Sequence, residues 1–243
     1  MPTLYVLHHS PWSERARWAL LHHKIAFEER EHVPLIGEIA LRMRTPVKGK
    51  GKASVPLLVA EGVAVQGSRA ISEWVDERGK RDKLFPEGSH DRIAKLDDAL
   101  EDALHAARER FVRDLPNDRE AQMESLPPFL RALPGAGLSA KLGGAFIAMK
   151  YNARLGSVDD RIRGGLRHVR ETLEGKEYVL GEFSFADILA TTVVHAVAPN
   201  DKFIRLGPGT RRLWKHEKLA KEFPDLVEWR DRIYAKHRPK SKS

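Results

Sequence analysis

Two short segments carry residues that could together bind an anion beside a strand. The first is Ser54-Val55-Pro56, which runs into an apolar, strand-like stretch. Proline cannot donate a hydrogen bond within a sheet, so Pro56 is expected at the first residue of that strand, where a cis peptide bond is a candidate. Further along, Ser68 precedes an apolar helical pattern and is expected to be the N-cap of a helix. The exposed N–H groups and positive end of such a helix would form an anion site; the alternative is a plain hairpin followed by a plain cap.

The composition excludes several kinds of chemistry. The 243 residues contain no cysteine, which excludes disulfides, thiolate metal sites and a cysteine nucleophile. His8 and His9 are adjacent on a strand and point to opposite faces, so they cannot share a metal ion, and we expect no metal. No apolar run approaches the roughly 20 residues that a membrane span needs. The first residues lack the basic region of a secretory signal, and together these features fit a cytoplasmic protein.

The basic charge of the chain is concentrated at one end. Residues 202–243 hold 13 Lys and Arg against 5 Asp and Glu, a net charge of +8, whereas the other 201 residues hold 29 of each. Such a segment can dock on a nucleic acid, an anionic lipid or an acidic protein. Residues 236–243 contain no interleaved aromatic residue that could stack on bases, and the alternative is a solvated tail that aids solubility.

The pattern of elements predicts an α/β domain followed by an all-helical one. Before the Val55-Pro56 segment, elements are predicted at residues 3–7 (strand), 14–23 (helix), 27–33 (strand) and 35–43 (helix). Two further strands and the capped helix complete a βαβ–αββα order, which is the thioredoxin-like pattern. After a linker at 77–88, the apolar stripe from Ile93 to Phe111 predicts a long amphipathic helix. We therefore expect a thioredoxin-like domain over residues 1–80 and a helical bundle over 89–243.

Four motifs, in this order along the chain, are similar to those of the glutathione transferases. They are Ser10-Pro11-Trp12-Ser13-Glu14-Arg15-Ala16-Arg17, Val55-Pro56, Ser68-Arg69-Ala70-Ile71 and Phe183-Ser184-Phe185-Ala186-Asp187. The first resembles the catalytic turn of the omega- and tau-like branches, and the last resembles the capping box of a buried helix. The resemblance covers residues 1 to about 235, although residues 112–156 contain no motif that matches.

In this resemblance, Ser10 occupies the place of the catalytic serine or cysteine, between the first strand and the first helix. A thiol has an unperturbed pKa near 8.5. A hydroxyl that donates a hydrogen bond to the sulfur, aided by the helix dipole, would favour the thiolate of glutathione. Ser13 is the competing candidate, because it is the better placed N-cap of the first helix, and the third alternative is that no hydroxyl acts. The missing cysteine argues against a thiol reductase.

The resemblance also implies which residues hold glutathione. The backbone of Val55, the residue before Pro56, would pair with the cysteinyl part. Ser68 and the end of its helix would hold the γ-glutamyl carboxylate. In the Lys48, Lys50 and Lys52 loop, Lys52 is expected to meet the glycyl carboxylate, the alternative being a solvated loop.

Gly67 departs from the pattern of the family. An acidic or Gln side chain usually stands there and receives the γ-glutamyl ammonium group, whereas Gln66 is one place off and is expected to point to the other side of the strand. Losing this contact would cost about 1.5–3 kcal/mol, or tenfold or more in affinity. Binding would then be weaker, or an acidic side chain of a partner subunit would supply the contact.

The resemblance thus implies a glutathione transferase-like enzyme in which glutathione is a co-substrate and its thiolate attacks a hydrophobic electrophile. A second-substrate pocket between the domains would be bounded by Trp12, Arg108 and Phe111, and members of the family are commonly homodimers. The alternative is a non-catalytic binding protein on the same scaffold, whose residues 202–243 dock on a nucleic acid or an acidic partner, because a fold alone does not decide function.

Overall fold

The computed structural model describes residues 1–32, 43, 53–126, 131, 137, 157–202, 204 and 206–239. The chain divides into two compact units. The first unit contains residues 1–96, 176–192 and 233–243, and the second contains residues 97–175 and 193–232. Three long helices contribute residues to both units: α4 (His90–Asp114), α9 (Phe185–His195) and α12 (Pro224–His237). The domain boundaries expected from the sequence stay a prediction.

A four-stranded sheet forms the centre of the first unit. Its strands are β1 (Thr3–Val6), β2 (Glu28–Glu31), β3 (Leu57–Ala60) and β4 (Val63–Gln66), in the spatial order β2-β1-β3-β4. β1 and β2 are parallel, whereas β1 with β3 and β3 with β4 are antiparallel. Alternate residues of β1, Leu4 and Val6, are fully buried, because successive side chains of a strand point to opposite faces.

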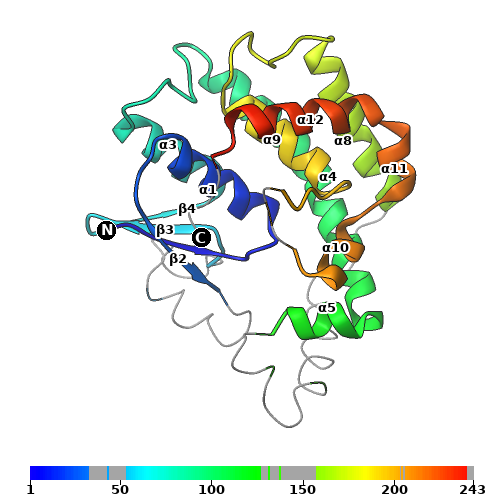
Figure 1. Cartoon of the computed structure of the whole chain (residues 1–243). Helices are drawn as coiled ribbons and strands as arrows, with labels where there is room; N and C mark the ends of the chain where they lie inside the picture. The colour runs from blue at the N-terminus through cyan, green and yellow to red at the C-terminus, as the bar shows by residue number, and fades with distance from the viewer. Residues whose placement is uncertain are drawn as a thin grey trace. The chain divides into compact units, whose positions relative to one another are not determined.

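Two helices of the first unit lie side by side over one face of this sheet (Figure 1), α1 (Pro11–His22) and α3 (Ser68–Arg78). Trp18 and Leu20 of α1 and Ile71 and Val75 of α3 are fully buried, which removes their apolar surface from water at about 25 cal/mol per Å². The thioredoxin-like arrangement predicted for this part of the chain is confirmed. The helix predicted at 35–43 and the Lys-rich loop lie outside the described residues, apart from Met43 and the last two residues of the loop.

Both helices begin at residues other than those predicted. α1 starts at Pro11 and not at Glu14, because Ser10 is its N-cap and proline suits the first helical position. The prediction that Ser13 caps this helix is therefore wrong. α3 starts at Ser68 itself, and its N-cap is Gly67, which has no side chain to cap with. Ser68 is thus the first helical residue, and its predicted N-cap role is also wrong.

The second unit is helical in its described part. It contains most of α4, the short 3-10 helix η1 (Leu115–Asn117), and the helices α5 (Arg119–Glu124), α8 (Val158–Leu173), α10 (Pro208–Trp214) and α11 (Glu217–Glu222). The long helix predicted from the apolar stripe is confirmed as α4. Gly165 of α8 lies against α4, where an added Cβ would come within 2.3 Å of the Ala103 side chain. Glycine therefore allows these two helices to approach closely.

The start of α9 is held by a buried carboxylate in the first unit. Asp187 accepts hydrogen bonds from the N–H and hydroxyl of Ser184 (2.9 and 3.1 Å) and from the N–H of Val179 (2.9 Å). Asp187 is fully buried, and burial raises its pKa to about 6 in spite of these bonds. The pairing of Ser184 with Asp187 predicted from their spacing is confirmed.

Among the described residues, no helix is both long and apolar enough to cross a membrane.

Candidate functional site

Three of the predicted site segments meet at one end of the sheet because of its register. Tyr5 of β1 pairs with Leu57 of β3, and Leu57 pairs with Gln66 of β4. These strands run antiparallel, so the end of β1 lies beside the start of β3, and the start of β3 lies beside the end of β4. The turn after β1 that carries Ser10, the Val55-Pro56 turn and the start of α3 therefore gather at the same edge.

Ser10 lies half-buried at the N-terminus of α1. Its Oγ accepts a long hydrogen bond from the N–H of Ser13 (3.5 Å), and its own N–H donates to the carbonyl of Leu7 (3.0 Å). A serine hydroxyl has one proton to donate and two lone pairs. The capping bond uses a lone pair, so the proton of the Ser10 hydroxyl can still point to an anion at the helix end.

Ser13 is placed differently. Its side chain is fully buried, and its Oγ accepts a hydrogen bond from the N–H of Leu7 (3.1 Å). This bond joins the first turn of α1 to the end of β1. Of the two serines considered from the sequence, Ser10 is the one whose side chain reaches solvent.

The Val55-Pro56 peptide bond is cis, as the sequence suggested. The carbonyl of Pro56 accepts a hydrogen bond from the N–H of Gly67 (3.0 Å), which holds the start of α3 against the turn. The side chain of Gln66 also reaches this turn, because its Oε1 accepts a hydrogen bond from the N–H of Ser54 (3.2 Å). Within the described part of the chain, the backbone of Val55 itself makes no backbone–backbone hydrogen bond outside the strands and helices.

The N-terminus of α3 has the features of an anion site. Gly67 has φ 95° and ψ 143°, a conformation that disfavours any residue with a Cβ. This geometry gives a physical reason for glycine where the family usually has a larger side chain. Gly67 has no side chain with which to cap α3, so an anionic ligand could accept hydrogen bonds from the first N–H groups of the helix. Ser68 is buried and lies at this end.

The remaining predicted site residues do not all belong to one described unit. Lys52 lies outside the described residues. Trp12 is half-buried on α1 in the first unit, whereas Arg108 and Phe111 belong to α4 in the second. Phe111 is buried and stacks on Trp214, with ring centroids 5.0 Å apart. The second-substrate pocket therefore stays a prediction.

A cluster of charges centred on a buried carboxylate of α1 was missed from the sequence. The Glu14 carboxylate, 1% exposed, accepts hydrogen bonds from Arg17 (2.7 Å) and from Arg238 (2.6 and 3.2 Å). Arg17 also donates to Glu29 of β2 (2.7 and 3.0 Å). The spacing of Glu14 and Arg17 on one helix face is a signal for their pairing, but no local pattern indicates Arg238.

This cluster predicts a loss of stability in acid. Burial alone would raise the pKa of Glu29, but the hydrogen bonds and charges of His8 and Arg17 lower it to about 2, from an ordinary value of 4.5. A depressed pKa means that the contribution to stability is present above pH 4.5 and is lost as the pH falls towards 2. We expect the free energy of unfolding of Glu29→Gln to be about 1–2 kcal/mol lower than that of the wild type at pH 7, and equal to it near pH 2.

Urea unfolding across this pH range measures the effect. Glu28→Gln is the matched control, because the Glu28 side chain is partly exposed and pairs with the exposed Arg30 of the same strand. Equal losses for Glu29→Gln at both pH values would show that the charge of Glu29 does not contribute.

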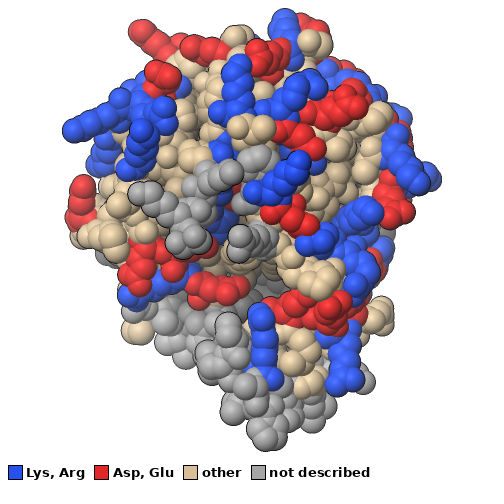
Figure 2. Space-filling view, in the orientation of Figure 1, with Lys and Arg blue, Asp and Glu red and all other residues tan. Residues whose placement is uncertain are grey.

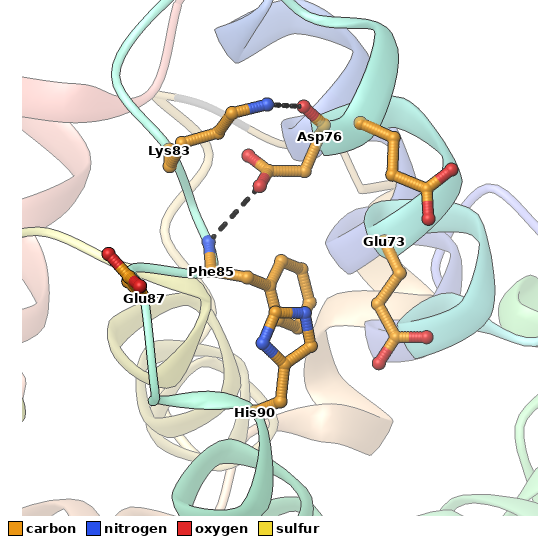
Figure 3. A pocket seen from close by; sticks show the side chains of 7 residues that line it. Glu73, Asp76, Lys83, Phe85, Glu87 and His90 are labelled. Atoms are coloured by element: carbon orange, nitrogen blue, oxygen red, sulfur yellow. Dashed lines mark hydrogen bonds between the residues drawn. The ribbon is translucent and has the colours of Figure 1, made fainter.

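A cavity of about 450 Å³ lies elsewhere in the first unit, between the second half of α3 and the start of α4 (Figure 3). The side chains that line it are Glu73, Asp76, Glu77, Lys83, Phe85, Glu87 and His90. Lys83 donates a hydrogen bond to the carbonyl of Asp76, and the Asp76 carboxylate accepts one from the N–H of Leu84 (2.6 Å). Asp76 therefore attaches the segment between α3 and α4 to the end of α3. Four carboxylates would repel an anion, and this cavity is therefore not the predicted anion site.

In the described residues, no group of acidic and histidine side chains suits a metal ion.

The comparisons with known proteins agree with this geometry. Residues 9–78 match the family model of the glutathione S-transferase N-terminal domain. A glutathione S-transferase of Methylobacterium radiotolerans, solved with glutathione sulfonate, is 20% identical with a TM-score of 0.57 over 100% of this chain and 96% of its own. A glutathione transferase family member of Pseudomonas fluorescens, solved with glutathione, is 18% identical with a TM-score of 0.57 over 99% and 100%. No curated protein matches the sequence.

The fold is that of the glutathione transferases, a thioredoxin-like domain followed by a helical region. The matched segment contains Ser10, Val55-Pro56, Gly67 and Ser68, which form the candidate site. Residues 9–78 are thus similar to the glutathione S-transferase N-terminal domain, and the whole chain has the fold of the solved glutathione S-transferases.

Proposed function

We propose that this protein binds glutathione at the shared end of β1, β3 and β4 and transfers its thiolate to an electrophilic small molecule. The observation that carries the proposal is the hydrogen bond from Gly67 N–H to the Pro56 carbonyl. It holds the uncapped end of α3 beside the Val55-Pro56 turn, and the strand register brings Ser10 to the same edge. Relatives of the same fold have been solved with glutathione.

Each part of glutathione has a counterpart in this proposal. The N–H groups at the start of α3 and the Ser68 hydroxyl hold the γ-glutamyl carboxylate, because a helix N-terminus favours an anion. The backbone of Val55 pairs with the cysteinyl part. The Ser10 hydroxyl donates to the sulfur, and the end of the α1 dipole further favours the thiolate. Lys52 meets the glycyl carboxylate.

The γ-glutamyl ammonium group has no partner at position 67 in this proposal. A partner subunit of a homodimer supplies an acidic side chain for it, or the affinity is lower by tenfold or more. The electrophile is hydrophobic and is bounded by Trp12, Arg108 and Phe111. We place the reaction in the cytoplasm.

The rival function, docking of residues 202–243 on a nucleic acid, is less favoured because many of their charges are already paired. Arg212 binds Asp118 (2.7 Å) and Lys236 binds Glu177 (2.7 Å). Figure 2 shows acidic and basic side chains interspersed on the side of the molecule where Figure 1 places α5, α10 and α11. A nucleic-acid surface needs a continuous basic patch that releases counterions, and paired charges reduce such a field.

Calorimetric titration with reduced glutathione tests the proposal. We expect a Kd in the millimolar range or tighter for the wild type, and about tenfold weaker binding for Ser68→Ala because a contact to a charged group is lost. Ser72→Ala is the matched control: it is a buried serine of the same helix whose hydroxyl donates to the Ser68 carbonyl (2.8 Å). We expect it to bind like the wild type. No binding at about ten millimolar would contradict the proposal and favour the rival.

A further inference from the structure

The end of α12 is folded into the first unit, although the sequence suggested a basic, solvated segment there. The His237 ring stacks on Phe183, with centroids 4.0 Å apart and planes inclined by 3°. Its Nε2 is 2.9 Å from the Tyr178 hydroxyl, and its carbonyl accepts a hydrogen bond from the Trp18 indole N–H of α1 (3.2 Å). His237 therefore joins α1 to the loop before α9.

The residue after His237 is Arg238, and its side chain reaches the buried carboxylate of Glu14 in α1. Arg238 is 5% exposed, and two of its nitrogens donate to the two oxygens of Glu14, at 2.6 and 3.2 Å. Such a two-point contact fixes orientation as well as charge. Burial penalises the charged form of Glu14, but Arg238 and Arg17 outweigh it and lower the pKa of Glu14. The carboxylate is therefore ionised at neutral pH.

Glu14 lies one helical turn from Ser10. Its backbone N–H donates to the Ser10 carbonyl (3.0 Å), which is the first hydrogen bond of α1. Helical side chains lean towards the N-terminus, so the negative charge of Glu14 is directed to the end of the helix that carries Ser10. Without compensation, this charge would oppose an anion at that end.

The charges around Glu14 balance only when Arg238 is present. Glu14 and Glu29 carry two negative charges, and Arg17 and Arg238 carry two positive ones. His8, at 3.9 Å from Glu29, is half-exposed. Arg15 of the same helix turns to Thr192 of α9 (2.9 Å). Removing Arg238 would leave a net charge of −1 in this cluster, and removing Glu14 would leave +1.

We propose that His237 and Arg238 are a clasp on α1, and that Arg238 is a positioning residue that sets the electrostatics of the Ser10 end through Glu14. The thiolate part of this inference rests on the proposed function, whereas the clasp does not. Residues 237 and 238 are then an integral part of the N-terminal unit, not a docking tail.

The first test measures the thiolate fraction of bound glutathione by ultraviolet absorbance as a function of pH. We expect Arg238→Gln to lower the thiolate fraction at neutral pH by about three- to tenfold, because a negative charge near the site is uncovered. Glu14→Gln should raise it, and Arg238→Lys should restore most of the loss. Lys236→Gln, which removes an exposed charge two residues away, is the matched control and should leave the fraction unchanged.

Opposite changes in the thiolate fraction for Arg238→Gln and Glu14→Gln support the proposal. If the substitutions only loosened the fold, the thiolate fraction would change in the same direction in both variants. Shifts of the same sign, or none, overturn it. If Arg238→Gln does not fold, Glu14→Gln is compared directly with the wild type, and a thiolate fraction that does not rise overturns the proposal.

The second test needs no ligand. Hydrogen exchange of the amides of residues 14–17 should be at least about tenfold faster in Arg238→Gln than in the wild type, and unchanged in Lys236→Gln. Equal protection in all three proteins would overturn the clasp. If the wild type fails to bind glutathione while Arg238→Gln speeds the exchange, the proposed function fails and the clasp stands.

Discussion

Ser10→Ala is expected to lower kcat/KM for glutathione conjugation by about 100-fold, with the binding of glutathione changed by less than about threefold. Removing one preorganised donor to a developing or bound anion costs about 10²–10³ in rate in comparable sites. Ser10 caps α1 with a long bond of 3.5 Å, so we expect only about 0.5–1 kcal/mol of stability to be lost with the cap. The measurements are steady-state kinetics with a model electrophile and the pH dependence of kcat/KM.

Ser13→Ala distinguishes the two serines considered from the sequence. The Ser13 hydroxyl is fully buried and accepts the N–H of Leu7, so we expect a loss of about 1–2 kcal/mol in the free energy of unfolding. The pH dependence of conjugation should not move. If Ser13→Ala, and not Ser10→Ala, shifts this pH dependence, the assignment of the hydroxyl to Ser10 is wrong.

Asp187→Ala is expected to lower the free energy of unfolding by about 3–5 kcal/mol, because three buried donors lose their acceptor at once. The donors are the N–H groups of Val179 and Ser184 and the Ser184 hydroxyl. They lie in the loop before α9 and at its first turn, so the loss would loosen the loop that also carries Phe183. Urea unfolding at pH 7, where the carboxylate is charged, measures the effect.

Ser184→Ala is the matched control for this change. It removes only one of the three hydrogen bonds to Asp187, and we expect it to cost about 1 kcal/mol. Equal losses for Asp187→Ala and Ser184→Ala would mean that the two backbone bonds contribute nothing measurable.

Local sequence patterns were sufficient for most of the described elements. The apolar stripe of α4, the short strands and the Ser184–Asp187 spacing each act within a few residues, and the chain forms these elements where they were expected. The cis peptide bond before Pro56 was also predicted from the sequence, but Pro56 precedes β3 and is not, as had been expected, its first residue. The errors were at helix starts. Ser13 and Ser68 have side chains that can cap a helix, but the backbone makes Ser10 the N-cap of α1 and Gly67 the N-cap of α3.

The sequence by itself determined the thioredoxin-like order of elements, and its motifs predicted a glutathione site formed by Ser10, Val55, Pro56 and Ser68. Only the tertiary structure decided how these residues combine, because the strand register brings three distant segments to one edge of the sheet. It also decided the state of Arg238: in the sequence this residue is one of many basic residues near the end of the chain. Its contact with Glu14 spans 224 positions, and folding is required to bring together two charges so far apart in the chain.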